Sequence, residues 1–275
     1  MTEFLPVSST AHLRICEALM GINLEDGYWK MFTIVIQLPA ILSLLIFFRI
    51  RLKEFGSTFP KGLKGDRTAL THPATLIIIA FICTTPAVLL KKFISKNLEN
   101  LTGIGLALLI GGIVMWIIDY VYRPIPGVKA KTRRLDQTTL PQAVWIGVCQ
   151  ILSGVFPGTS RSMATISAGQ VCGMSRPVAL EFSFLVSIPT MLAATGYELL
   201  KALKDGEGAA GKIHMDTHGI ILLTIGGLLS FVVAYAVVAW FMSWVRTRGF
   251  ALFAAYRIVV GAAVIFFAKQ IVGGH

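Results

Sequence analysis

Long apolar stretches separated by short polar ones constrain this chain more than any other feature. Six of them approach or exceed the roughly 20 residues that a helix needs to cross a bilayer. Only 14% of the 275 residues are charged, whereas a soluble domain carries about 25%. The sequence therefore excludes a soluble enzyme, a disordered chain and a secreted disulfide scaffold, and it predicts an all-α, polytopic membrane protein. The six predicted spans are Phe32–Phe48, Pro73–Leu90, Leu101–Tyr122, Ala179–Leu203, Gly219–Ser243 and Phe250–Val272.

Basic residues are concentrated in the short loops between these spans. The chain carries 25 Lys+Arg against 14 Asp+Glu, a net charge of +11. Three alternate loops, 49–72, 123–140 and 246–249, hold 6, 5 and 2 Lys or Arg, whereas the intervening loops and the C-terminal tail hold 3, 3 and 1. Cytoplasmic loops are the richer in Lys and Arg, so we assign the first set to the cytoplasm. We interpret the charge as a topology signal and expect no nucleic acid partner.

Two further apolar segments are interrupted by residues that break helices. Met1–Leu19 contains Pro6 followed by hydroxyl residues, and Leu140–Cys172 contains PGTSRS at residues 157–162. Broken helices are tolerated at membrane depth only where protein or a water-filled cavity satisfies the freed backbone groups. We therefore predict two re-entrant helix–loop–helix hairpins in addition to the six spans.

The two hairpins belong to a longer internal similarity. Residues 4–10 align with residues 155–161, and residues 32–39 align with residues 182–189. The prolines of these two motifs are 33 residues apart in the first copy and 32 in the second. Three spans separate the copies, an odd number, so the second copy must be inverted relative to the first.

This pattern predicts one membrane domain of residues 1–275, built from inverted-topology repeats of approximately 1–122 and 140–272. The two hairpin tips then meet near the middle of the bilayer. Pro157 follows a helical stretch that begins near residue 140, whereas Pro6 has only five residues before it. We therefore expect the first repeat to lack its leading helix.

Polar side chains gather at both predicted tips. An arginine fork binds phosphate oxygens bidentately, and the free N–H groups of the helix that resumes after the loop add donors. A carboxylate, hydroxyls and an imidazole are the groups used for proton transfer and nucleophilic attack. The first tip offers Glu3, Ser8, Ser9, Thr10 and His12, and the second offers Thr159, Ser160, Arg161 and Ser162.

Each of these residues also has a purely structural interpretation. Arg161 can merely pair with Glu3 or reach a lipid head group, and Glu3 can be a capping residue. His12 can be a structural histidine, and Ser8, Ser9 and Thr10 can serve only as helix N-caps. We interpret Glu181 and Arg257, which lie near or inside spans, mainly as members of structural ion pairs.

The sequence motifs at the two tips, and a third motif that follows them, resemble those of a known family. Residues 2–12 read TEFLPVSSTAH, residues 157–167 read PGTSRSMATIS, and residues 181–185 read EFSFL. In order and spacing they resemble the signatures of the bacterial undecaprenyl-diphosphatases of the BacA/UppP family, over essentially the whole chain. Two departures are that Ala11 replaces a usual glycine, and that the first glutamate of the family motif would precede Met1.

The resemblance implies hydrolysis of undecaprenyl diphosphate to undecaprenyl phosphate and phosphate. That reaction recycles the lipid carrier for peptidoglycan synthesis in the bacterial plasma membrane, with the active site opening toward the outer face. By the same resemblance Glu3, Ser9, His12 and Arg161 are catalytic: Ser9 matches a proposed nucleophile, His12 an acid/base or nucleophilic group, and Arg161 the residue that binds the diphosphate. The absence of the family's first glutamate leads us to expect impaired activity of this chain.

The remaining expectations concern ligands and alternatives. Substrate binding is assigned to Ser8, Thr10, Thr159, Ser160 and Ser162. We expect a divalent cation, Mg²⁺ or Ca²⁺, with Glu3 as a candidate ligand, no organic cofactor, contacts with membrane lipids, and a homodimer as the candidate assembly. The alternative function is a secondary transporter or lipid flippase, because inverted repeats with broken helices are typical of transporters.

Overall fold

The structure is a computed structural model, and it describes residues 2–21, 27–59, 69–88, 90, 101–123, 130–205 and 217–272. Within these ranges the only extended pairing is an isolated bridge between Thr132 and Met174, so the all-α prediction is confirmed. The α-helices are α1 (Ser9–Met20), α2 (Gly27–Val35), α3 (Gln37–Phe47), α4 (Arg49–Thr58), α5 (Pro73–Thr84), α7 (Leu101–Val121), α8 (Leu140–Val155), α9 (Arg161–Val171), α10 (Arg176–Asp205), α11 (Thr217–Thr247) and α12 (Ala251–Val272).

Four helices, α7, α10, α11 and α12, are individually long and apolar enough to cross a membrane. A fifth candidate is the pair 31–47 and Arg49–Thr58, which bends by 65°. The predicted span 32–48 coincides with the apolar helix 31–47, in which Ile36 separates α2 from α3. The span predicted from Pro73 is shorter than predicted: α5 ends at Thr84 before a turn. The membrane protein is thus confirmed with four to five candidate spans.

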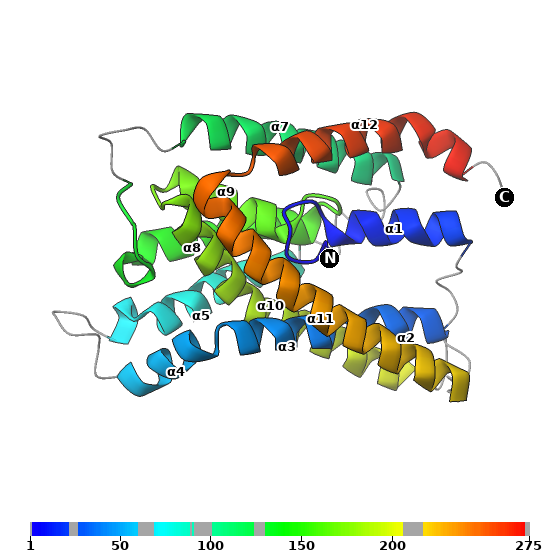
Figure 1. Cartoon of the computed structure of the whole chain (residues 1–275), viewed down its shortest axis with the longest axis horizontal. Helices are drawn as coiled ribbons and strands as arrows, with labels where there is room; N and C mark the ends of the chain where they lie inside the picture. Colours follow the sequence, from blue (N-terminus) through cyan, green and yellow to red (C-terminus); the bar gives the residue numbers. More distant parts are fainter. Residues whose placement is uncertain are drawn as a thin grey trace.

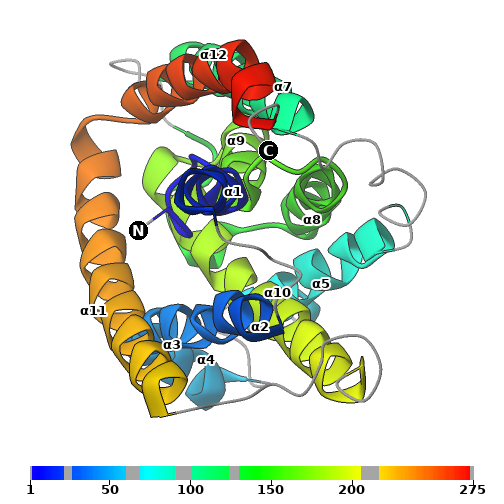
Figure 2. The same ribbon diagram turned by 90° about the vertical axis from the view of Figure 1, so that its right-hand side faces the viewer.

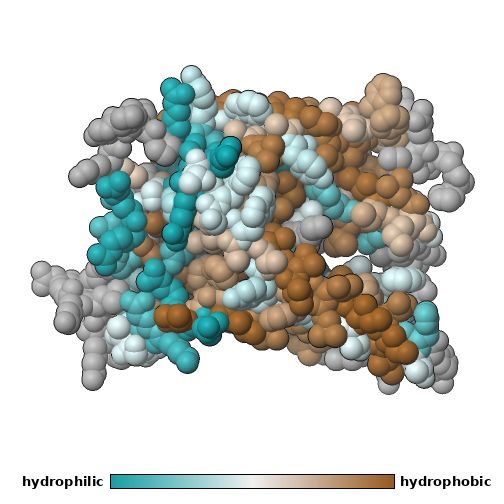
Figure 3. Space-filling view, viewed as in Figure 1, coloured by the Kyte–Doolittle hydropathy of each residue, from teal (hydrophilic) through white to brown (hydrophobic). Residues whose placement is uncertain are grey.

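The helix ends are sorted along the long axis of the molecule. In Figure 1 the ends of α4, α7 and α11 and the starts of α5, α8 and α12 all lie at the left. These ends flank the three loops richest in Lys and Arg. Figure 3 shows hydrophilic residues gathered at the same end and hydrophobic residues over much of the rest of that face. The three basic loops therefore start and finish on one side, as their charge predicted.

The second predicted hairpin is formed by α8 and α9. Helix α9 is buried from Ser162 to Gln170, whereas α8 lies toward the side of the assembly in Figure 2 and keeps an exposed apolar face that includes Trp145. The base of this hairpin is tied by Gln142, whose Oε1 accepts from the Thr139 amide (3.0 Å) and whose Nε2 donates to the Cys172 carbonyl (3.0 Å). Its tip turns at Gly158, which has φ +97°, and a Cβ there would lie 2.7 Å from the Ile104 carbonyl oxygen of α7. The break predicted from Pro-Gly is confirmed, and only a residue without a side chain fits it.

Helices α7 and α12 pack closely because glycines face each other. A Cβ on Gly105 would lie 3.2 Å from the Gly261 carbonyl oxygen, and one on Gly261 would lie 2.8 Å from the Gly105 carbonyl oxygen. Small residues let helix backbones approach in this way in membranes. The contact brings the middle of α12 close to the two tips.

Candidate active site

The two tips enclose a small cavity of about 120 Å³. Six of the nine predicted site residues line it, whereas His12, Thr159 and Ser162 do not. The second tip also contributes Pro157 and Gly158, and α8 contributes Ser153, which the sequence did not single out. The predicted residues that line the cavity are Glu3, Ser8, Ser9, Thr10, Ser160 and Arg161.

The helix that follows each tip, α1 after the first and α9 after the second, begins in the same way. Ser8 has φ +70° and Ser160 has φ +73°. In the described part of the chain these two serines are the only non-glycine residues with positive φ. The Oγ of Ser8 accepts from the Ala11 amide (3.4 Å), and the Oγ of Ser160 accepts from the Met163 amide (3.4 Å). Positive φ at a non-glycine residue costs free energy and clusters at functional sites. The capping interpretation is confirmed for Ser8, and Ser160 caps its helix in the same way. The backbone strain singles out both tips.

Geometry shifts the sequence alignment of the two tips by one residue. The prolines pair Ser8 with Thr159, but the matching helix caps pair Ser8 with Ser160. Gly158 accounts for the difference, since the second tip has one more residue between its proline and its cap.

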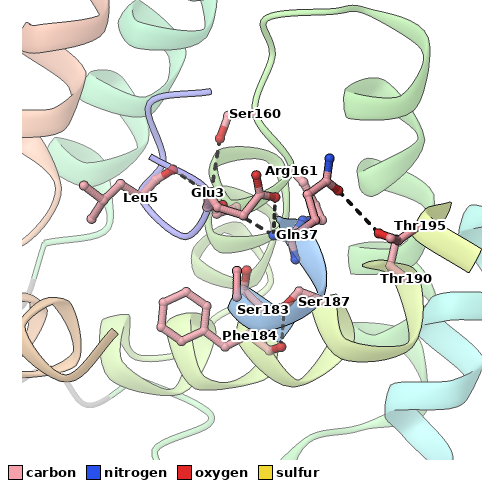
Figure 4. Close-up of polar contacts among 12 residues, drawn as sticks. Glu3, Leu5, Gln37, Ser160, Arg161, Ser183, Phe184, Ser187, Thr190 and Thr195 are labelled. Carbon is pink, nitrogen blue, oxygen red and sulfur yellow. Dashed lines mark hydrogen bonds and ion pairs between the residues drawn. The ribbon is translucent and has the colours of Figure 1, made fainter. Parts of the chain in front are cut away.

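Glu3 and Arg161 face each other across the cavity (Figure 4). Arg161 Nη2 lies 3.6 Å from Glu3 Oε1 and donates weakly to the Glu3 carbonyl (3.5 Å). Their side chains are 15% and 26% exposed, so neither is sealed from a ligand. Arg161 is also the first residue of α9, where free backbone N–H groups favour an anion. The pair is loose enough for a phosphate oxygen to displace the carboxylate.

Ser162 and Thr159 lie beside the cavity and hold the loops. Ser162 Oγ donates to the Leu5 carbonyl (3.0 Å) and lies 3.2 Å from Ser160 Oγ. The Thr159 amide donates to the Phe156 carbonyl (3.1 Å) within the second tip. Ser162 thus joins the two tips directly.

His12 is directed away from the cavity lining. Its Nδ1 lies 2.7 Å from the Ser8 carbonyl oxygen, which can only accept, so Nδ1 carries the proton of this bond. Its Nε2 lies 2.7 Å from the Tyr256 hydroxyl, and the two rings stack at 5.6 Å. The ring is thereby fixed against α12.

Arg257 of α12 is the residue that sequence reasoning underestimated. It is fully buried, and its guanidinium donates to the carbonyls of Pro6 (3.1 Å), Ala107 (3.1 Å) and Gly158 (3.2 Å). The predicted ion pair is wrong for this residue, because none of the residues that the structure describes supplies it a carboxylate. An arginine inside an apolar helix was the signal available in the sequence. The ion-pair interpretation is confirmed for Glu181, which lies 3.0 Å from Arg51.

The donors present do not form a metal site by themselves. Among the described ranges no cluster of three or more His, Cys, Asp or Glu residues occurs. The cavity has one carboxylate, Glu3, and this carboxylate already faces Arg161. A hard cation can still be held by one carboxylate when phosphate oxygens supply further ligands.

Comparison with known proteins places this sequence in a family. The family model described as bacitracin resistance protein BacA matches residues 1–263. The chain belongs to the BacA family. It is 63% identical over 274 residues to the undecaprenyl-diphosphatase of Koribacter versatilis (strain Ellin345), with 98% of this chain and 94% of the relative covered.

More distant BacA relatives are also matched over nearly their full length. Identity is 39% over 266 residues with the undecaprenyl-diphosphatase of Rhizobium etli (strain CIAT 652), covering 96% of this chain and 91% of the relative. It is 37% over 265 residues with undecaprenyl-diphosphatase 1 of Streptomyces coelicolor, covering 95% and 89%. The resemblance inferred from the two motifs is confirmed.

Proposed function

We propose that this BacA-family chain hydrolyses undecaprenyl diphosphate to undecaprenyl phosphate and inorganic phosphate. The observation that carries the proposal is the cavity between the two tips, in which Glu3 faces Arg161 at 3.6 Å among serine and threonine hydroxyls. The names of the curated relatives support the substrate. In a bacterial plasma membrane this reaction recycles the lipid carrier for peptidoglycan synthesis.

In the proposed complex the second tip binds the diphosphate. Arg161 contacts phosphoryl oxygens in place of its contact with Glu3, and the Ser160 hydroxyl and the first N–H groups of α9 add donors. Arg161 changes partner when the substrate binds. Once the diphosphate is bound, all of these donors stabilise the negative charge that develops during transfer without further reorganisation. The isoprenoid tail stays in the bilayer beside the apolar helices.

The first tip performs the chemistry. Glu3 takes a proton from the Ser9 hydroxyl, or from a water that Ser9 orients, as the oxygen attacks the terminal phosphorus. The bond between the terminal phosphorus and the bridging oxygen breaks, and the lipid phosphate leaves with that oxygen. If Ser9 attacks, water then hydrolyses the phosphoserine. His12 as acid or nucleophile is the second assignment, and it requires the ring to leave Tyr256.

We also propose that the protein and the substrate together bind a divalent cation, Mg²⁺ or Ca²⁺. Glu3 would hold it through its carboxylate, and oxygen atoms of the bound diphosphate would supply further ligands. When bound, such an ion neutralises charge on the phosphates. The roles assigned above to Arg161 and Ser9 do not depend on it.

The proposed topology has six spans and two re-entrant hairpins in an inverted repeat, forming one membrane domain with the cavity open toward the outer face. The shared positive-φ serine caps support the repeat, and the sorting of the basic loops to one end supports the cytoplasmic assignment. A homodimer is the proposed assembly, and the exposed apolar residues of α11, such as Leu228 (64%) and Val232 (60%), face lipid or a second copy.

Phosphate release by the purified chain in detergent tests the proposal. The substrate is a polyprenyl diphosphate, and the matched variants are Arg161→Ala and Arg134→Ala, the latter removing an exposed arginine at the other end of the molecule. We expect release from the native chain and from Arg134→Ala, and release slower by roughly 1,000-fold or more from Arg161→Ala. A transporter has no compartments to work between in detergent, so an inactive native chain that moves the lipid across proteoliposomes would favour the flippase alternative.

A further inference from the structure

Arg257 is a buried cation, and among the residues that the structure describes no buried anion lies beside it. Its relative exposure is 0%, its Nε has no hydrogen-bond partner, and within the ranges the structure describes no Asp or Glu pairs with it. Burying a charge is costly unless hydrogen bonds compensate it. A long buried side chain in this state therefore needs a reason beyond packing.

The contacts of Arg257 supply that reason. Its Nη1 donates to the Pro6 carbonyl of the first tip (3.1 Å), and its Nη2 donates to the Gly158 carbonyl of the second tip (3.2 Å). Nη2 also donates to the Ala107 carbonyl of α7 (3.1 Å). One guanidinium thus joins both broken loops to one another and to a membrane-spanning helix. Pro6 lies three residues from Glu3, and Gly158 lies three residues from Arg161.

The surroundings are shaped for a guanidinium. A Cβ on Gly111 of α7 would collide with Arg257 Nη2, and a Cβ on Gly112 would lie 3.0 Å from Arg257 Cβ. The planar fork of arginine can donate to three separately placed carbonyls, whereas the compact ammonium of lysine is a point donor. Carbonyls of broken loops at membrane depth must be satisfied internally, and here the same residue does so at both tips.

We propose that Arg257 is a positioning residue that holds the two tips at the spacing in which Glu3 and Arg161 act on one phosphate. It touches backbone carbonyls rather than the reacting atoms, so its effect passes through the tips. The guanidinium contacts the carbonyl groups of both tips from the side of α12. A phosphate bound between the tips would bring a negative charge close to this buried positive charge. The effect on turnover rests on the proposed function, whereas the effect on the tips does not.

The test compares Arg257→Met, Arg257→Lys and a control, Arg176→Met, in the full-length protein. Arg176 is also largely buried (15% exposed) and pairs with Asp119 at 2.8 Å, but at the arginine-rich end of the molecule. Two quantities are measured: hydrogen exchange of peptides covering residues 2–12 and 153–163, and kcat and KM for a polyprenyl diphosphate per folded molecule. If Arg257 only adds stability, exchange rises across the protein and not at the two tips in particular, and kcat per folded molecule stays native.

We expect Arg257→Met to speed exchange at both tips and to lower kcat about 100-fold, with a smaller change in KM, because misplacement of about 1 Å has that cost. Arg257→Lys recovers part of both, and it replaces the Met variant if that one does not fold. Arg176→Met leaves tip exchange and kcat native even if its melting temperature falls.

Three results would overturn the proposal: native exchange at both tips in Arg257→Met, loosened tips with native kcat, or equal effects from Arg176→Met. If the native chain hydrolyses no diphosphate lipid, the proposed function fails, and the exchange arm alone still decides whether Arg257 holds the tips.

Discussion

The two tips have the same serine cap, but the helices that follow them differ in how deeply they are buried. In the second, every residue of α9 from Ser162 to Gln170 is buried. In the first, Ala11 is the one buried residue among the described side chains of α1, and Leu19 and Met20 at its end are 73% and 72% exposed. One tip therefore sits on a rigid platform, and the other is carried by a helix that packs little. The difference suggests a division of labour: the fixed tip binds the anion, and the other brings the reactive groups.

The first tip is held through its loop rather than through its helix. Phe4 is fully buried and meets the ring of Phe184 edge-on at 5.8 Å. The next two residues, Leu5 and Pro6, give their carbonyls to Ser162 and Arg257. These contacts compensate for the exposed α1.

Removing the anion-binding group of the fixed tip has the largest expected effect. Arg161→Ala should lower kcat/KM by roughly 1,000-fold or more, because preorganised charge at the transferring phosphoryl group is the largest catalytic contribution. Membrane insertion and the circular dichroism spectrum should stay native. Near-native turnover would show that the second tip does not bind the phosphate.

The carboxylate of the other tip should affect turnover more than binding. Glu3→Gln keeps the shape of the side chain but cannot accept the proton, so we expect kcat to fall by about 100- to 1,000-fold with KM nearly unchanged. Steady-state kinetics of Glu3→Gln and Arg161→Ala are compared. A raised KM in Arg161→Ala and a native KM in Glu3→Gln would show that the second tip binds the substrate and the first tip acts on it. A raised KM with native kcat in Glu3→Gln would reverse the two roles.

The hydroxyls should separate nucleophile from lining. Ser9→Ala should lower kcat about 100-fold, whereas Ser153→Ala, which removes a hydroxyl from the α8 side of the same cavity, should change it less than about threefold. Trapped phosphoenzyme, measured by mass spectrometry after acid quench, identifies covalent attack. Equal losses from both variants would remove Ser9 from the chemistry.

The anchoring of the first loop gives the smallest expected effect. Phe4→Leu keeps most of the buried volume and should destabilise the protein by about 1 kcal/mol, while Leu19→Ala on the exposed end of α1 should change stability by less than about 0.5 kcal/mol. Thermal unfolding in detergent measures both. A larger loss from Leu19→Ala would mean that α1, rather than its loop, holds the first hairpin.

Much of the site could be predicted because its chemistry is local in sequence. Pro157 and Gly158 break a helix wherever they occur, and Glu3 and Arg161 are ionisable residues in apolar surroundings. The inverted alignment then predicted that the two tips meet. These signals depend on residue type and spacing, which a sequence states directly.

The rest depended on partners that a sequence does not reveal. Arg257 finds three backbone carbonyls, which carry no residue-type signal, and His12 finds Tyr256, 244 positions away. Asp119, left uninterpreted from sequence, pairs with Arg176 and accepts from the Phe250 amide. The bend of 65° between residues 31–47 and α4 was missed for a different reason: Arg49 and Arg51 mark the start of a loop by their charge, but the chain continues there as a helix.

A double-mutant cycle between the two tips tests most directly whether they form one catalytic site. Turnover is measured for the native chain, Glu3→Gln, Arg161→Ala and the double variant, each corrected for folded protein. The effects of mutating groups that act together on one phosphate are strongly non-additive. The turnover of the double variant should therefore lie within about threefold of that of Arg161→Ala alone. A loss equal to the product of the two single losses would contradict a shared site.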